Sequence, residues 1–104
     1  MIIPRGYVDE KQIADGVQRA AAAFAPHVVR IRYNLGEDWS GDPSVFFRVL
    51  VTDEITHSDG WRVLAGQVKD RVLSETEAYE LGLLPYFNYR TVSEQAELNE
   101  KAWD

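Results

Sequence analysis

Apolar and polar residues recur with two different periods along this chain, and these periods predict its helices and strands. The first helical stripe consists of four apolar residues, Ile13, Val17, Ala21 and Phe24. It predicts a helix over residues 9–25, capped by Asp9 together with Gln12 and ended by Pro26. Gly16 lies in the middle of this helix and weakens it by roughly 1 kcal/mol relative to alanine.

Two later segments alternate with a period of two, as strands do when one face is buried. The first alternates Val29, Ile31, Tyr33 and Leu35 with Val28, Arg30, Arg32 and Asn34. The second alternates Val45, Phe47, Val49 and Val51 with Phe46, Arg48, Leu50 and Thr52. Because the second segment is the more apolar, we expect it to be central in a sheet or covered on both faces. Residues 36–44 join the two segments, which is long for a tight hairpin.

Further capping signals and apolar stripes predict helices in the second half of the chain. Ser58 or Asp59 is expected to end a loop and to cap a second helix. The stripe of this helix is Trp61, Leu64, Val68 and Val72. Ser74 with Glu77 is another capping signature, so we expect a short helix to restart there and to end at Gly82.

A third strand is predicted to begin at Pro85, because proline is tolerated at the first residue of a strand. Its two faces carry Phe87, Tyr89 and Thr91 on one side and Asn88 and Arg90 on the other. A last, acidic helix is expected within residues 93–104, opened by Ser93. The order α-β-β-α-(α)-β-α predicts a single α+β domain, residues 1–104, with helices mainly on one face of a three-stranded sheet.

The net charge of −6 is unevenly distributed along the chain. Residues 1–74 carry nine Lys/Arg and ten Asp/Glu, whereas residues 75–104 carry two and seven. Nucleic acid is therefore not an expected ligand, because phosphates favour a net positive charge. The acidic C-terminal segment is expected either to dock on a basic protein partner or to form a solvated helix face.

The composition also restricts chemistry and location. There is no cysteine, which excludes disulfides and thiolate sites. No apolar run has the ~20 residues of a membrane helix, and the start MIIPRGYVDE lacks the apolar stretch of a signal peptide. We therefore expect a cytoplasmic protein without a membrane segment.

The strand positions opposite the regular apolar alternation carry four arginines, Arg30, Arg32, Arg48 and Arg90. If their faces coincide, the guanidiniums gather on the uncovered side of the sheet, where their planar forks suit phosphate or carboxylate groups. The alternative is pairing within the chain, for which the candidate acids are Glu37, Asp38, Glu54 and Glu94. Trp39 and Phe46 near these arginines could stack on a base or a partner side chain, or form a secondary core.

Other chemistry-bearing residues form no complete set. Glu37, Asp38 and Asp42 are candidate oxygen ligands for Mg²⁺, but the EF-hand spacing and the Walker motif are absent. His27 and His57 are candidates for a metal ligand or a general base, or are solvated loop residues. No catalytic residue, metal site or cofactor is therefore predicted.

The layout from the first helix to the third strand, about residues 9–92, resembles the minimal nucleotidyltransferase fold. That family carries a Gly-Ser pair after its first strand and an Asp-x-Asp pair opening its second, whose carboxylates hold Mg²⁺ against nucleotide phosphates. Here the first strand leads into Leu35-Gly36-Glu37-Asp38, Ser40-Gly41 has the reversed order, and Phe46-Phe47-Arg48 stands in place of the paired acids. The resemblance implies a degenerate member that serves as an antitoxin-like partner of a separately encoded helical nuclease.

Two main functional hypotheses follow. The first is a non-enzymatic interaction or regulatory module of antitoxin-like type that binds a protein partner. The second is a nucleotide- or phosphate-binding protein, or a Mg²⁺-dependent nucleotidyltransferase-like enzyme, with the arginines and the acids of the 36–48 loop as its site. Self-association through an exposed strand edge or Trp103 is a third expectation.

Overall fold

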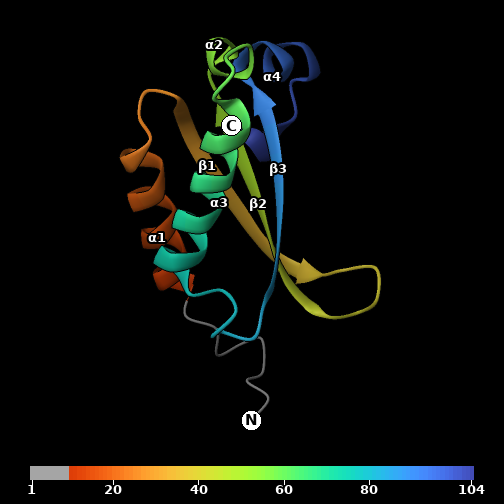
Figure 1. The fold of residues 1–104 in the computed structure, drawn as a ribbon. Coiled ribbons are helices and arrows are strands. Elements are labelled where there is room, and N and C mark those ends of the chain that lie inside the picture. Colours follow the sequence, from red (N-terminus) through yellow and green to blue (C-terminus); the bar gives the residue numbers. More distant parts are fainter. Residues whose placement is uncertain (1–9) are drawn as a thin grey trace.

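The helices and strands follow one another along the chain in the order that the sequence predicts (Figure 1). The structure is a computed structural model that describes residues 10–104. The elements are α1 (Glu10–Ala23), β1 (Val28–Glu37), β2 (Pro43–Val51), α2 (Asp53–Thr56), α3 (Trp61–Thr76), β3 (Leu84–Thr91), α4 (Val92–Leu98) and the short 3₁₀-helix η2 (Lys101–Trp103). The predicted α+β class is therefore confirmed.

The sheet is mixed, with the strand order β1-β2-β3. β1 and β2 form an antiparallel hairpin, and β2 pairs in parallel with β3, so that α3 is the crossover between them (Figure 1). The most apolar strand, β2, is the central one, as its sequence predicts. In register across the sheet, Phe47 of β2 lies between Tyr33 of β1 and Phe87 of β3.

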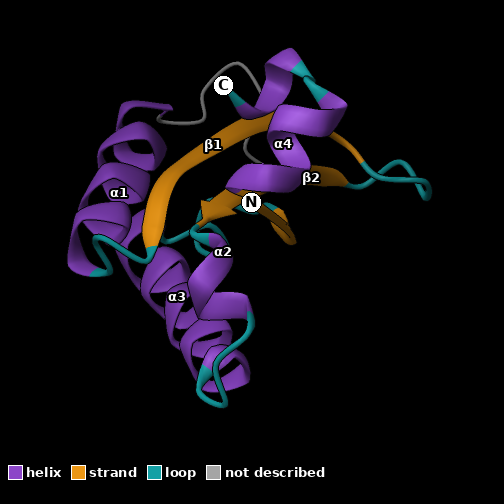
Figure 2. Ribbon diagram, turned by 90° about the horizontal axis from the view of Figure 1, so that it is seen from above, coloured by secondary structure: helices purple, strands orange, loops and turns teal. Residues whose placement is uncertain are grey.

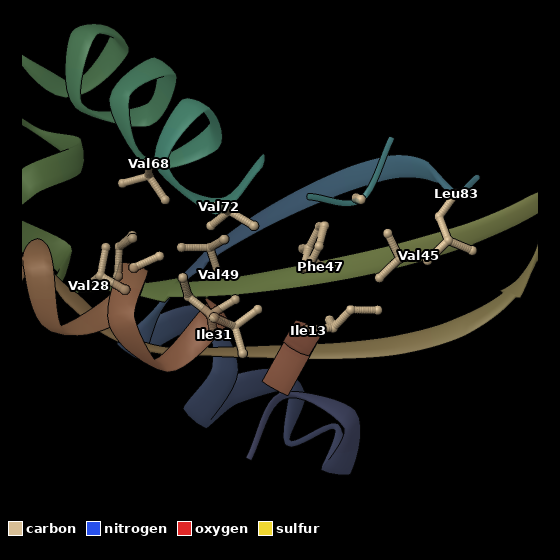
Figure 3. Packing of buried hydrophobic residues seen from close by; sticks show 13 residues of the cluster. Ile13, Val28, Ile31, Val45, Phe47, Val49, Val68, Val72 and Leu83 are labelled. Atoms are coloured by element: carbon tan, nitrogen blue, oxygen red, sulfur yellow. The ribbon is translucent and has the colours of Figure 1, made fainter. Parts of the chain in front are cut away.

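One face of the sheet forms the hydrophobic core with α1 and α3, which lie on the same side of it (Figure 2). Figure 3 shows Val68 and Val72 of α3 packed towards Val49 and Phe47 of β2. The helices approach closely at Gly16, where an added Cβ would lie 2.8 Å from the carbonyl oxygen of Glu75 in α3. The glycine in the middle of α1 is thus a contact point between helices.

The opposite face of the sheet is covered at one end by the C-terminal segment. Figure 2 shows α4 on the other side of the sheet from α1 and α3. η2 lies against β2, and its Trp103 is 6% exposed. Trp103 did not fit the core pattern of the sequence, because the residues that enclose it come from strands far away in the chain.

Several predicted helix boundaries are wrong in detail. α1 ends at Ala23, two residues earlier than expected, and the proposed capping residue Asp9 lies outside the described residues. α2 occupies part of the predicted loop before α3. Gly60, without a side-chain cap, stands at the N-cap of α3 in place of Ser58 or Asp59.

α3 does not restart at Ser74 but continues to Thr76, and residues 78–82 form turns instead of a short helix. The buried stripe of Val68, Val72 and Thr76 has i, i+4 spacing, so packing carries the helix past the capping signature. Glu77, in the left-handed conformation with φ 54°, ends it.

The last acidic helix is also shorter than predicted and begins earlier. Thr91 caps α4 in a capping box with Glu94, whereas Ser93 hydrogen-bonds through its hydroxyl to the carboxylate of Asp53 and so ties α4 to α2. Asn99 ends α4 in the left-handed conformation, after which the chain turns back onto the sheet. Among residues 10–104, no helix has the length and apolar character needed to cross a membrane.

Candidate functional site

The four predicted arginines lie on one face of the sheet, which we call the arginine face. Ile31, Val49 and Tyr89 point into or towards the core, so their neighbours in the strands point to the other side. Two rows cross this face in register: Arg30, Leu50 and Arg90, then Arg32, Arg48 and Asn88. The alternation therefore identified which side chains share a face from Arg30 onwards. It is wrong at the start of β1, where a register shift between Val28 and Arg30 leaves Val28 buried in the core and Val29 exposed.

Three of these arginines are held by the C-terminal segment. The Nε atoms of Arg30 and Arg32 donate to the carbonyl oxygens of Trp103 (3.0 Å) and Asp104 (2.6 Å). The guanidinium of Arg90 lies 4.2 Å from the centroid of the Trp103 ring, which is a cation–π contact. This end of the arginine face is occupied by the chain itself.

Two polar side chains also bind Arg90. Its Nη1 donates to Gln95 Oε1 and its Nη2 to Glu100 Oε1, both at 2.8 Å. Gln95 is buried and donates in turn to the carbonyl of Glu100 at 2.6 Å and to Asp104 Oδ1 at 3.1 Å. Pairing within the chain is therefore correct for Arg90, but with Glu100 in place of the four acids proposed from the sequence.

Arg48 differs from the other three arginines. It is half-buried, and it forms no hydrogen bond or ion pair with any of residues 10–104. Its cross-strand neighbour is Arg32, a like charge that raises the local positive potential. The free guanidinium lies beside the open end of the arginine face.

That open end is aromatic. Phe46 and Tyr86 are neighbours in register, and their rings stack with centroids 5.4 Å apart and planes inclined by 17°. The Tyr86 hydroxyl donates to Asp38 Oδ2 at 2.7 Å, which connects β3 to the β1–β2 loop. Tyr86 was not among the predicted binding residues. The sequence did contain a signal for it, because Tyr86 lies two residues before Asn88 and therefore on the same face of the strand.

Asp38 organises the loop that joins β1 and β2. Its Oδ1 accepts from the backbone N–H groups of Ser40 (2.9 Å) and Asp42 (3.0 Å) and from the Ser40 hydroxyl (2.8 Å). The hydrogen bond from Tyr86, followed by those from Ser40 and Asp42, lowers the pKa of Asp38 to about 2. Both oxygens of this carboxylate thus serve the loop structure.

Trp39 extends from the fixed loop and is 92% exposed. Together with Phe46, Tyr86 and Asn88 it lines a hollow of about 410 Å³. We call the set Trp39, Phe46, Arg48 and Tyr86 the aromatic corner. It brings together three of the six binding residues predicted from the sequence. The other three hydrogen-bond to the C-terminal segment, Arg32 while remaining exposed.

Of the remaining candidates, Glu37 and Asp38 also line this hollow, whereas the two histidines lie elsewhere. Within residues 10–104, no group of three or more histidine, aspartate or glutamate side chains is placed to hold a metal ion. His27 and His57 are both exposed, at the start of β1 and after α2. Neither histidine lines the aromatic corner.

Comparison with known proteins finds no matching family model, curated protein or solved structure. The chemistry of the arginine face combines an exposed indole, two stacked rings and a guanidinium that no side chain within residues 10–104 pairs with, on a preorganised loop and sheet.

Proposed function

We propose that this protein is a non-enzymatic interaction module of antitoxin-like, regulatory type, and that a protein partner docks on its aromatic corner in the cytoplasm. The observation that carries the proposal is Trp39, a large apolar side chain with 92% exposure on a loop fixed by Asp38. Tryptophan and arginine are the residues most enriched at the energetic centres of protein interfaces.

The rigidity of the corner favours binding. The bonds of Asp38 to Ser40, Asp42 and Tyr86 hold the loop before any partner arrives, so less conformational entropy is lost on association. Arg48, which forms no ion pair in the described part of the chain, adds a cation that suits a carboxylate on the partner. Partner recognition would thus combine an apolar contact with one charge-assisted hydrogen bond.

Two further features support the non-enzymatic interpretation. Phe46 and Arg48 occupy the strand positions where the nucleotidyltransferase family, which the layout resembles, carries its catalytic acids. Glu94 and Glu97 remain exposed on α4, whereas Glu100 pairs with Arg90. The two exposed acids offer a secondary contact for a partner with a basic surface.

The test compares capture of proteins from native lysate by the wild-type chain and two variants, Trp39→Ala and Arg48→Glu. A partner of the aromatic corner should be retained by the wild type and reduced at least tenfold by each variant, because central interface residues contribute about 2 kcal/mol or more. Val63→Ala is the matched control, since Val63 is 64% exposed on α3, on the other side of the sheet. Equal capture by all four proteins would contradict the proposal.

A nucleotide or phosphate ligand is the second candidate function. The observation that favours it is the stacked Phe46–Tyr86 pair beside Arg48, since aromatic rings stack on bases and guanidinium binds phosphate. A thermal-shift screen against nucleotides, with and without Mg²⁺, tests it directly. No shift in melting temperature at millimolar nucleotide would eliminate this candidate and leave the protein-interaction proposal untouched.

A further inference from the structure

β3 is an edge strand with the composition of a covered strand. It contains Leu84, Tyr86, Phe87 and Tyr89, yet none of its residues is buried, whereas most of β2 is. No strand within residues 10–104 pairs along its outer side (Figure 1). It has no lysine, and its one arginine, Arg90, is turned onto the C-terminal segment. Lysine, outward-pointing charges and proline usually protect an edge strand from pairing with another chain, and of these β3 has only Pro85.

One hydrogen bond identifies which backbone groups of β3 point outwards. The N–H of Thr91 donates to Glu94 Oε1 at 3.0 Å, so it does not pair with β2. Backbone groups of a strand point to alternate sides, so the N–H and C=O groups of Phe87 and Tyr89 also point away from β2. Pro85, which has no N–H, belongs to this same outward set.

The outer edge of β3 is bordered by concave surface on both sides. On the side of the core, Trp61, Phe87 and Tyr89 contribute to a hollow of about 450 Å³. On the side of the hairpin, Trp39 and Tyr86 contribute to the hollow of about 410 Å³. Phe87 and Asn88 line both hollows, so an added strand would find aromatic side chains on each side of it.

We propose that a second copy of this chain adds its own β3 to this edge, antiparallel and with the two-fold axis at Asn88. In this register Phe87 of each copy lies opposite Tyr89 of the other, and the outward N–H and C=O groups of these two residues meet. Each copy then donates two backbone hydrogen bonds and accepts two. Pro85 and the capped Thr91, which have no free N–H, end the ladder on either side.

The side chains of β3 suit this self-pairing. Directly opposed residues of antiparallel strands lie on the same face, so Phe87 packs against Tyr89 of the second copy, twice, on the side of α3. On the arginine face, Tyr86 lies opposite Arg90 of the second copy, and no two like charges are opposed. The self-complementary pattern is the reason to choose a second copy as the occupant of this edge.

The dimer leaves the proposed docking surface available. Because the axis is perpendicular to the sheet, both aromatic corners lie on the same side of one six-stranded sheet, formed by the three strands of each copy. The pairing uses the edge of β3 and borders the hollow of the aromatic corner, so the two proposals share Tyr86. Partner docking centres on Trp39 and Arg48, which lie outside the paired strand, so substitutions there distinguish the two proposals.

A single cysteine tests the register, because the chain has none of its own. Asn88→Cys places two thiols across the axis with Cα atoms about 4.5 Å apart, within the range of a disulfide. Under mild oxidation this variant should become a disulfide-linked dimer on a non-reducing gel. Ser74→Cys, at an exposed position of α3, is the matched control and should remain largely monomeric.

Sedimentation tests the association itself. At tens of micromolar the wild type should have the mass of a dimer, and Asn88→Lys, which opposes two cations across the axis, should be a folded monomer by circular dichroism. A monomeric wild type, or equal cross-linking of the Asn88→Cys and Ser74→Cys variants, would overturn the inference. Trp39→Ala should stay dimeric while losing partner capture, so the failure of one proposal is separable from the failure of the other.

Discussion

The Asp38 carboxylate shows how a single side chain fixes the shape of the candidate site. Its pKa of about 2 lies below the ordinary value of 3.8, mainly because Tyr86 and Ser40 donate hydrogen bonds to the charged form. A lowered pKa in the folded state means that this stabilisation is complete above about pH 4 and is lost as the pH falls towards 2.

We therefore expect the melting temperature of Asp38→Asn to be lower than that of the wild type by a constant amount at pH 5–7. This difference should shrink between pH 4 and pH 2, where the wild-type carboxylate takes up its proton. Thermal denaturation at a series of pH values measures it. Tyr86→Phe removes the largest cause of the lowered pKa of Asp38, so the pH range over which the melting-temperature difference changes should become narrower. A melting-temperature difference that does not depend on pH would contradict this role of Asp38.

Residue alternation predicted the arginine face but not the partners of its arginines. Period two is a local property, so the sequence was sufficient to place each arginine opposite the apolar positions of its own strand. That the faces of the three strands coincide follows from the register of the sheet. The groups that bind Arg30 and Arg32 lie 73 and 72 residues away along the chain. No local pattern encodes such a contact, and the free state of Arg48 could be found only in the fold.

At the scale of elements, the contact between α1 and α3 decides what Gly16 does. Helix propensity alone predicts that Gly16→Ala stabilises α1 by roughly 1 kcal/mol. In the structure the new Cβ would lie 2.8 Å from the Glu75 carbonyl oxygen and 2.9 Å from Thr76 Cγ2, so the helices would have to separate. Overpacking of this kind costs about 1–3 kcal/mol.

We therefore expect Gly16→Ala to lower the free energy of unfolding by up to about 2 kcal/mol in urea denaturation, because the propensity gain offsets part of the strain. Gly66→Ala in α3 is the control, because its Cβ would meet no atom within 4 Å. That variant should be stabilised, by at most about 1 kcal/mol. Equal stabilisation by both substitutions would refute the close helix contact.

Element boundaries were less predictable than element types for a related reason. The S-x-x-E signature at Ser74 is overridden because Val72 and Thr76 keep packing on the core. The start of α4 is set instead by the pair Thr91 and Glu94, which has the same chemistry as the expected cap but a different place. Capping signatures are short and recur by chance, and tertiary packing selects among them.

At the scale of the whole molecule, the uneven charge of the chain is partly neutralised by its own fold. The acidic C-terminal segment returns over the arginine face, where Glu100 pairs with Arg90 and carbonyl oxygens accept from Arg30 and Arg32. The sequence suggested two separate surfaces, one acidic and one basic. In the structure each covers part of the other, and Trp103 anchors the contact.

Trp103 and Trp39 are therefore expected to contribute very differently to the free energy of unfolding. Trp103→Ala removes a side chain that is 6% exposed and should destabilise the fold by about 3 kcal/mol, at the lower end for a buried tryptophan. Trp39→Ala, at 92% exposure, should leave the free energy of unfolding nearly unchanged. Chemical denaturation of both variants measures the contrast.

Trp103→Ala should also expose the basic end of the sheet. Without the Trp103 ring against Arg90, the C-terminal segment is held less firmly, so Arg30, Arg32 and Arg90 become accessible to anions. At a pH just below the pI of about 4.8, where the chain carries a net positive charge, the folded Trp103→Ala protein should therefore elute from a cation-exchange column at higher salt than the wild type. Trp39→Ala should elute as the wild type does. If Trp103→Ala showed neither effect, the C-terminal segment would not be the cover of the arginine face, and all four arginines would have to be counted in the candidate site.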